Sequence, residues 1–163
     1  MIDKGEFVSL VDQKREMLYR VARTILKNDE DCKDALQEAI LKSWACRNKL
    51  RDISMFSTWI TRILINECHT LVRKKWKYLL EAEVEISTPS RASDPALQLA
   101  LEGLPERWRL PLVLHYLEGY TYEQVAKLLH LSQSTVRSRL SHGRIALRKS
   151  MEEEKEAWLH EIQ

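Results

Sequence analysis

The fold class is decided by residues 121–140, which read TYEQVAKLLHLSQSTVRSRL. Thr121 and Gln124 have the spacing of a capping box, which begins a helix whose apolar stripe ends at Leu131. Ser132 can cap a second helix, and the outer face of this helix carries short polar side chains and arginines. Two helices joined by a tight turn, the second with a polar outer face, predict a helix-turn-helix.

Apolar residues recur at helical spacing in three segments N-terminal to this motif, residues 7–27, 28–45 and 56–75. Only four glycines and four prolines occur among 163 residues, which disfavours a many-stranded or proline-rich protein. Hydrophobic residues make up 44% of the chain, which is enough to fill buried cores. We therefore expect an all-α fold.

The helical pattern stops at residues 78–94, where acids are followed by serine, threonine and proline. This composition is typical of an exposed, flexible linker. We therefore expect two small helical domains, residues 1–77 and 95–163, the second of which ends in an acidic tail.

Local signals in the second domain set the expected helix ends. Asp94 is placed to cap a helix that has Pro95 at its first position. Pro111 predicts a kink or a restart within the apolar stretch 110–117, and Gly119 predicts the end of that stretch.

A net charge of +2 hides two strongly basic segments. Residues 51–80 contain six basic and two acidic side chains, and residues 131–150 contain five basic and no acidic ones. Either segment alone is typical of a solvated face. Because the second coincides with the helix-turn-helix, and because basic side chains that neutralise phosphates release counterions, we expect DNA to be contacted by both domains.

Several classes of function are disfavoured. The three cysteines form no C-x-x-C pair, and no stretch approaches the ~18 uninterrupted apolar residues of a membrane span, so we expect a soluble cytoplasmic chain with no direct membrane insertion. Asp34 and Glu38 could act as paired carboxylates, and His115 or His130 as a base. No nucleophile, glycine-rich loop or metal-ligand set accompanies them in the sequence, so we expect neither an enzyme nor a metal or cofactor.

Two segments of the first domain resemble a known family. Residues 34–44, DALQEAILKSW, and residues 56–66, FSTWITRILIN, resemble region 2 of the extracytoplasmic-function (ECF) subfamily of bacterial sigma-70 RNA polymerase sigma factors. Residues 118–126, EGYTYEQVA, and residues 134–140, STVRSRL, look like region 4 of the same subfamily. The resemblance covers about residues 7–150, in the family's order.

The resemblance implies a promoter-specificity subunit without catalysis, which initiates transcription of a specific stress or signal regulon. Its implied partners are core RNA polymerase, through the β′ clamp helices and the β subunit, promoter DNA, and an anti-sigma factor that in many members is membrane-anchored. The chain departs from the family at Ser134, where glycine is usual, and at His142-Gly143-Arg144, where Arg-Ala-Arg is common. These departures leave the promoter sequence open.

The resemblance also implies site residues. The positions that match the polymerase-binding surface are Asp34, Gln37, Glu38, Leu41 and Trp44. Those that match the minus-10 contacts are Asn66 for a base and Arg62, Arg73, Lys74 and Lys75 for phosphates, with the loop 47–55 receiving a flipped base. Those that match the minus-35 recognition helix are Ser134, Thr135, Arg137, Ser138, Arg139, His142 and Arg144.

Two other functions stay open. A stand-alone helix-turn-helix regulator would bind duplex DNA as a dimer, but it leaves the first domain unexplained. A helical adaptor protein would use its basic residues only for solubility. Trp76, which lies among lysines, could stack on an unpaired base or pack along a backbone.

Overall fold

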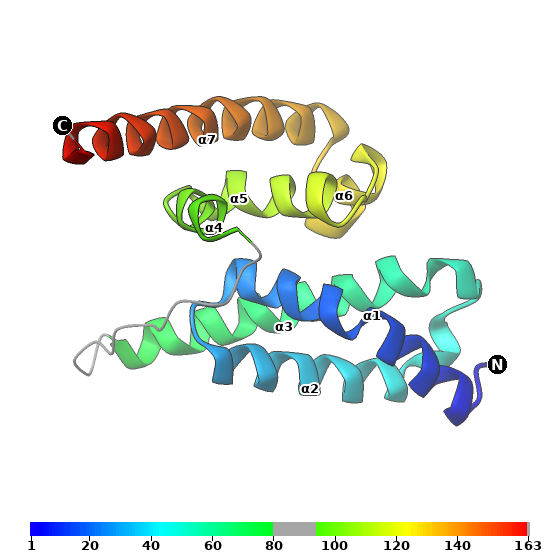
Figure 1. Ribbon diagram of the computed structural model, residues 1–163. Coiled ribbons are helices and arrows are strands. Elements are labelled where there is room, and N and C mark those ends of the chain that lie inside the picture. Colours follow the sequence, from blue (N-terminus) through cyan, green and yellow to red (C-terminus); the bar gives the residue numbers. More distant parts are fainter. Residues whose placement is uncertain (80–93, 163) are drawn as a thin grey trace. The chain divides into compact units, whose positions relative to one another are not determined.

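Within residues 1–79 and 94–162, the part of the chain that the computed structural model describes, every regular element is helical (Figure 1). The all-α prediction is therefore confirmed. The chain divides into two units, Met1–Ser90 and Arg91–Gln163. The predicted linker lies mostly outside the described residues, so the predicted domain boundaries and the linker's flexibility stay predictions.

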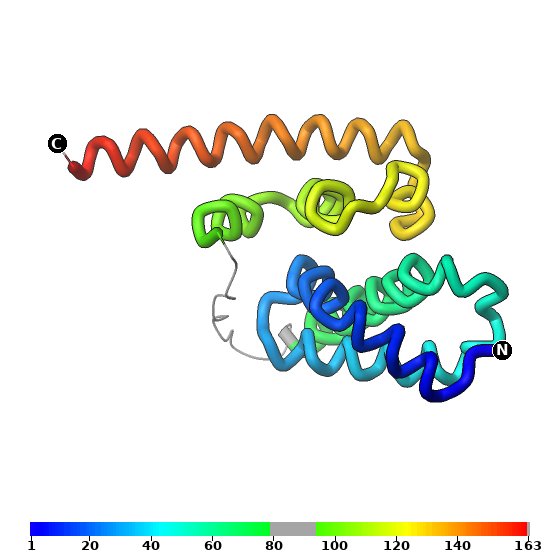
Figure 2. Tube along the Cα trace, turned by 45° about the vertical axis from the view of Figure 1, so that its right-hand side comes forward, coloured from blue at the N-terminus to red at the C-terminus, as the bar shows by residue number. Residues whose placement is uncertain are grey.

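The first unit is a bundle of α1 (Lys4–Ile25), α2 (Asp29–Ala45) and α3 (Phe56–Leu79), which lie side by side in Figures 1 and 2. Each of the three helices contacts the other two. The apolar stripes meet in one core, and its largest fully buried side chains include Phe56, Leu18, Ile60, Leu64 and Ile65.

Polar caps begin the first two helices of this bundle. Asp3 caps α1 and Asn28 caps α2, each by accepting a backbone N–H from the first turn, at 2.9 and 2.7 Å. Between α2 and α3 the chain makes two short 3-10 turns, η1 (Arg47–Lys49) and η2 (Ile53–Met55). The predicted helix starts in this unit are thus correct to within a few residues.

The second unit packs α4 (Pro95–Glu102), α5 (Glu106–Leu112) and α6 (Tyr122–Leu129) against α7 (Gln133–Ile162). Asp94 caps α4 as predicted. The buried side chains that join these helices include Leu110, Leu114, Val125, Leu128, Val136 and Leu140.

Helices α6 and α7 form the predicted helix-turn-helix. Thr121 Oγ1 accepts the backbone N–H of Gln124 at 3.2 Å, and the Gln124 carboxamide accepts that of Thr121 at 2.9 Å, so the capping box is confirmed. His130 ends α6 in the left-handed conformation, with φ of 56°. At the start of α7, Ser132 Oγ accepts the N–H of Thr135 at 3.2 Å.

The helix does not restart at Pro111. This residue lies inside α5, and the chain passes directly into η3, a π-helix over Val113–Leu117 in which the N–H of Glu118 bonds to the carbonyl of Val113 at 3.0 Å. Proline cannot donate the hydrogen bond of a regular α-helix, and the wider turn follows two residues later. Gly119, with φ of 76°, ends the segment as predicted.

Gly143 lies where α7 packs against α5. A Cβ at this position would stand 2.9 Å from Cδ1 of Leu112 and 3.3 Å from Cβ of Trp108. Both distances are shorter than ordinary van der Waals contact, so glycine allows the close approach of the two helices.

Helix α7 continues through the acidic tail to Ile162. Trp158 and Ile162 near its end are 62% and 60% exposed. Among the described residues, none of the helices combines the length and the apolar character needed to cross a membrane.

Candidate nucleic-acid and protein interfaces

The outer face of α2 carries four of the five residues predicted to bind polymerase. Asp34, Gln37, Glu38 and Leu41 are all exposed, and 56% of Leu41 is accessible to solvent. They share one face because about 100° separates successive residues of a helix. The opposite face is buried in the bundle through Cys32, Ala35, Ala39 and Ser43. We call Asp34, Gln37, Glu38 and Leu41 the α2 face.

Trp44, the fifth predicted residue, packs within the bundle. Its indole lies 5.2 Å from the ring of Phe7, and the guanidinium carbon of Arg47 lies 3.9 Å from its centroid. Its side chain is therefore half-buried, with neighbours on its ring that a partner would have to displace or cover. The ring of Trp44 thus contributes to the packing of α2 against α1.

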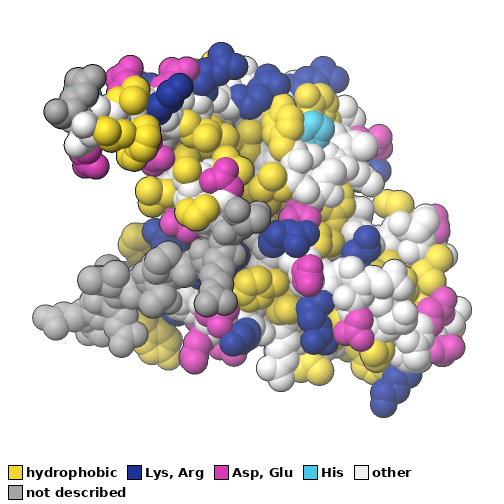
Figure 3. Space-filling view, in the orientation of Figure 1, with side chains coloured by type: hydrophobic (Ala, Val, Ile, Leu, Met, Phe, Trp, Pro, Cys, Tyr) yellow, Lys and Arg dark blue, Asp and Glu magenta, His cyan; other side chains and the backbone are white. Residues whose placement is uncertain are grey.

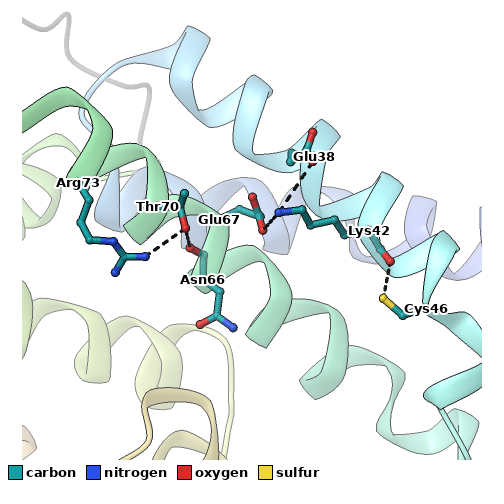
Figure 4. Close-up of polar contacts among 7 residues, drawn as sticks. All are labelled: Glu38, Lys42, Cys46, Asn66, Glu67, Thr70 and Arg73. Atoms are coloured by element: carbon teal, nitrogen blue, oxygen red, sulfur yellow. Dashed lines mark hydrogen bonds and ion pairs between the residues drawn. The ribbon is translucent and has the colours of Figure 1, made fainter. Parts of the chain in front are cut away.

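An ion pair joins α2 to α3 beside this face (Figure 4). Lys42 Nζ lies 2.6 Å from Glu67 Oε1 and 3.9 Å from Glu38 Oε1. The hydrogen bond to Glu67 raises the pKa of Lys42. The two predicted interfaces of this unit lie on α2 and α3, and Asn66 of the second is next to Glu67 in the sequence. The Lys42–Glu67 ion pair therefore holds the two helices together close to both interfaces.

Three of the predicted minus-10 residues share one exposed stripe of α3. Arg62, Asn66 and Arg73 are spaced by four and seven residues, and all three are exposed. The guanidinium of Arg73 donates to Thr70 Oγ1 at 3.2 Å, and Figure 4 shows the carboxamide of Asn66 projecting outward from α3. Trp76, 65% exposed, follows on the same side. We call Arg62, Asn66 and Arg73 the α3 stripe.

The other two predicted phosphate contacts do not join this stripe. Lys74 is exposed, but it lies one residue further round the helix than Arg73. Lys75 lies on the far side of α3 and forms an ion pair with Asp31 of α2. Of the three consecutive basic residues, Arg73 therefore lies on the α3 stripe, Lys74 lies beside it, and Lys75 joins α3 to α2.

The loop predicted to receive a base precedes α3. Asp52 accepts the N–H of Ser54 at 2.9 Å, and hydrogen bonds to Ser54 lower the pKa of the Asp52 carboxyl. Ile53 and Met55 are 46% and 40% exposed. Two partly exposed apolar side chains beside a capped turn provide a surface against which a flat ring can pack.

The outer face of α7 carries most of the predicted recognition residues. Ser134, Arg137, Ser138 and His142 are exposed, and in Figure 3 basic side chains gather along this helix. Thr135 is half-buried, and its hydroxyl lies 2.8 Å from that of Ser132 in the turn. Arg139 is half-buried and Arg144 is exposed.

Aromatic side chains from other helices contact two of these residues, His142 and Arg137. The indole of Trp108 stacks on His142 at 6.0 Å and an interplanar angle of 11°. The guanidinium carbon of Arg137 lies 5.8 Å from the ring centroid of Tyr122. These aromatic partners were not predicted from the sequence, because 15 and 34 residues separate Tyr122 and Trp108 from the α7 residues they contact and no local pattern connects them.

No group of three or more His, Cys, Asp or Glu residues is placed to hold a metal ion within the described ranges. The chemistry available at these surfaces is that of exposed carboxylates, carboxamides, hydroxyls and guanidinium groups. They suit hydrogen bonding and charge pairing with a protein or nucleic acid.

Two family models match the chain in succession. The model described as Sigma-70 region 2 matches residues 10–78, and the model described as Sigma-70, region 4 matches residues 95–147. The first match contains the α2 face and the α3 stripe, and the second contains the helix-turn-helix. Both domains therefore define a sigma-70 type RNA polymerase sigma factor.

Relatives place the chain within that class. It is 27% identical over 169 residues to the ECF RNA polymerase sigma factor SigW of Bacillus subtilis (strain 168), covering 91% of this chain and 90% of that protein. It is 30% identical over 137 residues to the ECF RNA polymerase sigma-E factor of Escherichia coli (strain K12), covering 72% of each. The chain belongs to the ECF sigma factor family, whose members are not enzymes.

A solved structure has the same fold. The co-crystal structure of the sigma factor RpoE in complex with the anti-sigma factor NepR from Bartonella quintana contains a chain that matches with a TM-score of 0.82. The sequence identity is 21%, and the match covers 90% of this chain and 97% of that one.

Proposed function

We propose that this sigma factor binds core RNA polymerase through the α2 face, contacts the minus-10 element through the α3 stripe, and contacts the minus-35 element through α7. In this way it directs polymerase to the promoters of a specific stress or signal regulon, where DNA and polymerase meet in the bacterial cytoplasm. The observation that supports this most is the placement of an acidic and apolar face and a basic stripe on adjacent helices of one unit, with a helix-turn-helix in the other.

The α2 face suits a helical protein partner. Exposed Leu41 offers apolar area, and Asp34 and Glu38 flank it with negative charge on the same side of the helix. Such an arrangement fits a helix that carries apolar and basic side chains, which is the character we propose for the β′ clamp helices.

The α3 stripe suits DNA that is opened. Arg62 and Arg73 can neutralise phosphates, and the carboxamide of Asn66 can donate to and accept from a base edge. Residues 47–55 supply the adjoining surface for a base that has left the stack, since capture of an unstacked base favours melting. Lys74 contributes to the local positive charge, whereas Lys75 is assigned to the contact with Asp31.

Helix α7 suits the major groove. Ser134 and Ser138 are short enough to let the helix approach base edges closely, and Arg137 can make two hydrogen bonds to guanine. Thr135 and Arg139 lie at the margins of that face, and together with His142 and Arg144 they complete the proposed minus-35 contacts.

We also propose that an anti-sigma factor holds the chain inactive by covering the α2 face. The support is of two kinds: the solved relative is in complex with an anti-sigma factor, and the exposed Leu41 is a surface that a competitor of polymerase would cover. A membrane anchor on that regulator would place the inactive complex at the membrane.

The deciding experiment is run-off transcription from a pool of genomic promoters, with core bacterial RNA polymerase and with or without the full chain. New discrete start sites are expected, and alignment of their upstream sequences gives both promoter elements. Leu41→Asp should abolish them by blocking polymerase binding, whereas Val8→Asp, which alters another exposed apolar residue of the same unit, should not. A sequence-specific shift of duplex DNA by the chain alone, without new start sites, would instead indicate a stand-alone regulator.

A further inference from the structure

Tyr116 and Arg144 form an exposed pair between η3 and α7. The Arg144 guanidinium donates a hydrogen bond of 2.8 Å from Nη1 to Oη of Tyr116, although 28 residues separate them in the sequence. Tyr116 is 49% exposed, and Arg144 is exposed as well. Because the phenol oxygen accepts from Arg144, its own O–H is left to donate to a further acceptor, beside the remaining N–H groups of the guanidinium.

The backbone that carries Tyr116 is unusual. It lies in the π-helix, where Val113 and Leu114 are buried and Tyr116 is turned outward. A π turn adds one residue to the helical turn and so rotates the residues after it by about 100° relative to a continuous α-helix. Such turns are rare and occur often at functional sites. Here the π turn presents the Tyr116 hydroxyl to α7.

The ring of Tyr116 is also held in place. The imidazole of His115 meets it edge to face, with centroids 4.8 Å apart, and Nδ1 of His115 lies 2.7 Å from the carbonyl oxygen of Tyr120. The hydrogen bond to this fixed tyrosine orders the Arg144 side chain before a ligand binds. Arg144 then loses less rotamer entropy on binding.

Arg144 lies about two turns further along α7 than Arg137, the residue proposed to read guanine. It follows Arg137 by seven residues and therefore shares its side of the helix, where Tyr122 and Tyr116 contact the two arginines in turn. A recognition helix in the major groove contacts base edges with its N-terminal residues, so a basic side chain two turns further along is placed to meet the sugar-phosphate backbone.

We propose that Tyr116 and Arg144 together form a binding site for one backbone phosphate of promoter DNA. This proposal rests on the proposed docking of α7 at the minus-35 element. The guanidinium N–H groups and the phenol O–H donate to the non-bridging oxygens of the phosphodiester, with Tyr116 holding Arg144 ready in the free protein. Arg144 is then a backbone contact, which fixes the position of α7 without reading sequence, and Tyr116 is a contact that the family resemblance does not supply.

The test uses holoenzyme assembled from the full chain and core polymerase, and two promoter duplexes. One duplex carries the upstream element mapped by run-off transcription, and the other has that element scrambled. Arg144→Ala should weaken binding to both by the same factor, about tenfold, and should reduce the slope of log affinity against log salt by about 1. Lys155→Ala removes a charge three turns further along the same side of α7 and should change neither quantity.

The hydroxyl of Tyr116 is tested in a double-mutant cycle. Tyr116→Phe should weaken binding to both duplexes by about two- to fivefold, and the double variant should lose less affinity than the two single losses combined, because both side chains hold the same phosphate. Replacing single phosphates by neutral methylphosphonates should reveal one position that weakens binding by the wild type far more than binding by Arg144→Ala. That position identifies the bound phosphate.

Two results would overturn the proposal. If Tyr116→Phe binds as the wild type does, or if its loss adds in full to that of Arg144→Ala, the pair is not a joint phosphate site. The assignment of α7 survives that result if Arg137→Ala still weakens binding to the mapped duplex selectively. If Arg137→Ala, Arg144→Ala and Tyr116→Phe all bind as the wild type does, the assignment of α7 to the minus-35 element fails, and the pair fails with it.

Discussion

Lys75 of α3 forms an ion pair with Asp31 in the first turn of α2, and this contact places Lys75 on the opposite side of α3 from Arg73. Asp31 is largely covered, with 15% of its side chain exposed. Two basic residues that are close neighbours in the sequence therefore differ in their contacts: Arg73 lies on the α3 stripe, and Lys75, with 49% of its side chain exposed, pairs with the largely covered Asp31 of α2.

Arg73→Ala and Lys75→Ala are expected to differ accordingly. Arg73→Ala should weaken promoter binding by holoenzyme about five- to tenfold and reduce its salt dependence, because one phosphate contact is lost. Lys75→Ala should change promoter binding less than about twofold and lower the melting temperature of the first unit, because Asp31 loses its partner. Filter binding at several salt concentrations and thermal melting separate the two outcomes, and equal losses of DNA affinity would contradict the division.

Arg137→Ala tests the recognition helix. We expect the free energy of minus-35 binding to weaken by ~1–3 kcal/mol, the cost of one bidentate base contact, with no change in affinity for core polymerase. Competition between the mapped duplex and its scrambled form measures the first quantity, and fluorescence titration with core polymerase measures the second. If Arg137→Ala weakened both minus-35 binding and core polymerase binding, the proposed assignment of DNA binding to α7 and polymerase binding to α2 would be wrong.

Gly143→Ala tests the close packing of α7 on α5. Alanine raises helix propensity by ~1 kcal/mol, but its methyl group would press on Leu112 and Trp108 and cost ~1–3 kcal/mol. We expect the free energy of unfolding of the second unit to fall by ~1 kcal/mol, as measured by urea denaturation. The double variant Gly143→Ala, Leu112→Val should recover part of the lost free energy of unfolding. An increase in stability for Gly143→Ala alone would show that Leu112 and Trp108 move aside to make room for the methyl group.

Tyr19 provides a test by pH. Partial burial, and then a hydrogen bond to the carboxylate of Asp29, raise the pKa of Tyr19 from 10.0 to about 12. The neutral phenol is thus favoured in the folded state, so its contribution to stability is complete below pH 10.0 and is lost as the pH rises toward about 12. The ultraviolet absorbance of tyrosinate in the wild type minus that in Tyr19→Phe should have its midpoint near pH 12. A midpoint at the ordinary value would show that the hydroxyl is not engaged.

Local sequence signals predicted the features that local interactions determine. The capping box of Thr121 and Gln124 involves residues three apart, and the apolar stripe that ends at Leu131 follows from helical periodicity, so both could be identified before the structure. The acidic and apolar spacing of Asp34, Glu38 and Leu41 was similarly sufficient to place them on one face.

The remaining features depend on contacts between helices. Helical spacing alone could have separated Lys75 from Arg73, but only the structure supplies Asp31 as its partner. The hydrogen bond from Arg144 to Tyr116 joins α7 to a π turn, whose wider backbone pairing begins at Val113. Sequence periodicity assumes a constant number of residues per turn and cannot anticipate such a change.

Helix α7 has a mechanical consequence. Its 30 residues form one continuous rod about 45 Å long, and its buried residues, Val136, Leu140 and Gly143, all lie in the first half. A small tilt of the recognition end sweeps the far end, near Trp158, through a much wider arc. A molecule bound to the tail would therefore exert torque on the first turns of α7, where DNA binding is proposed. A spectroscopic label on the tail would report a small tilt of those turns as a large displacement.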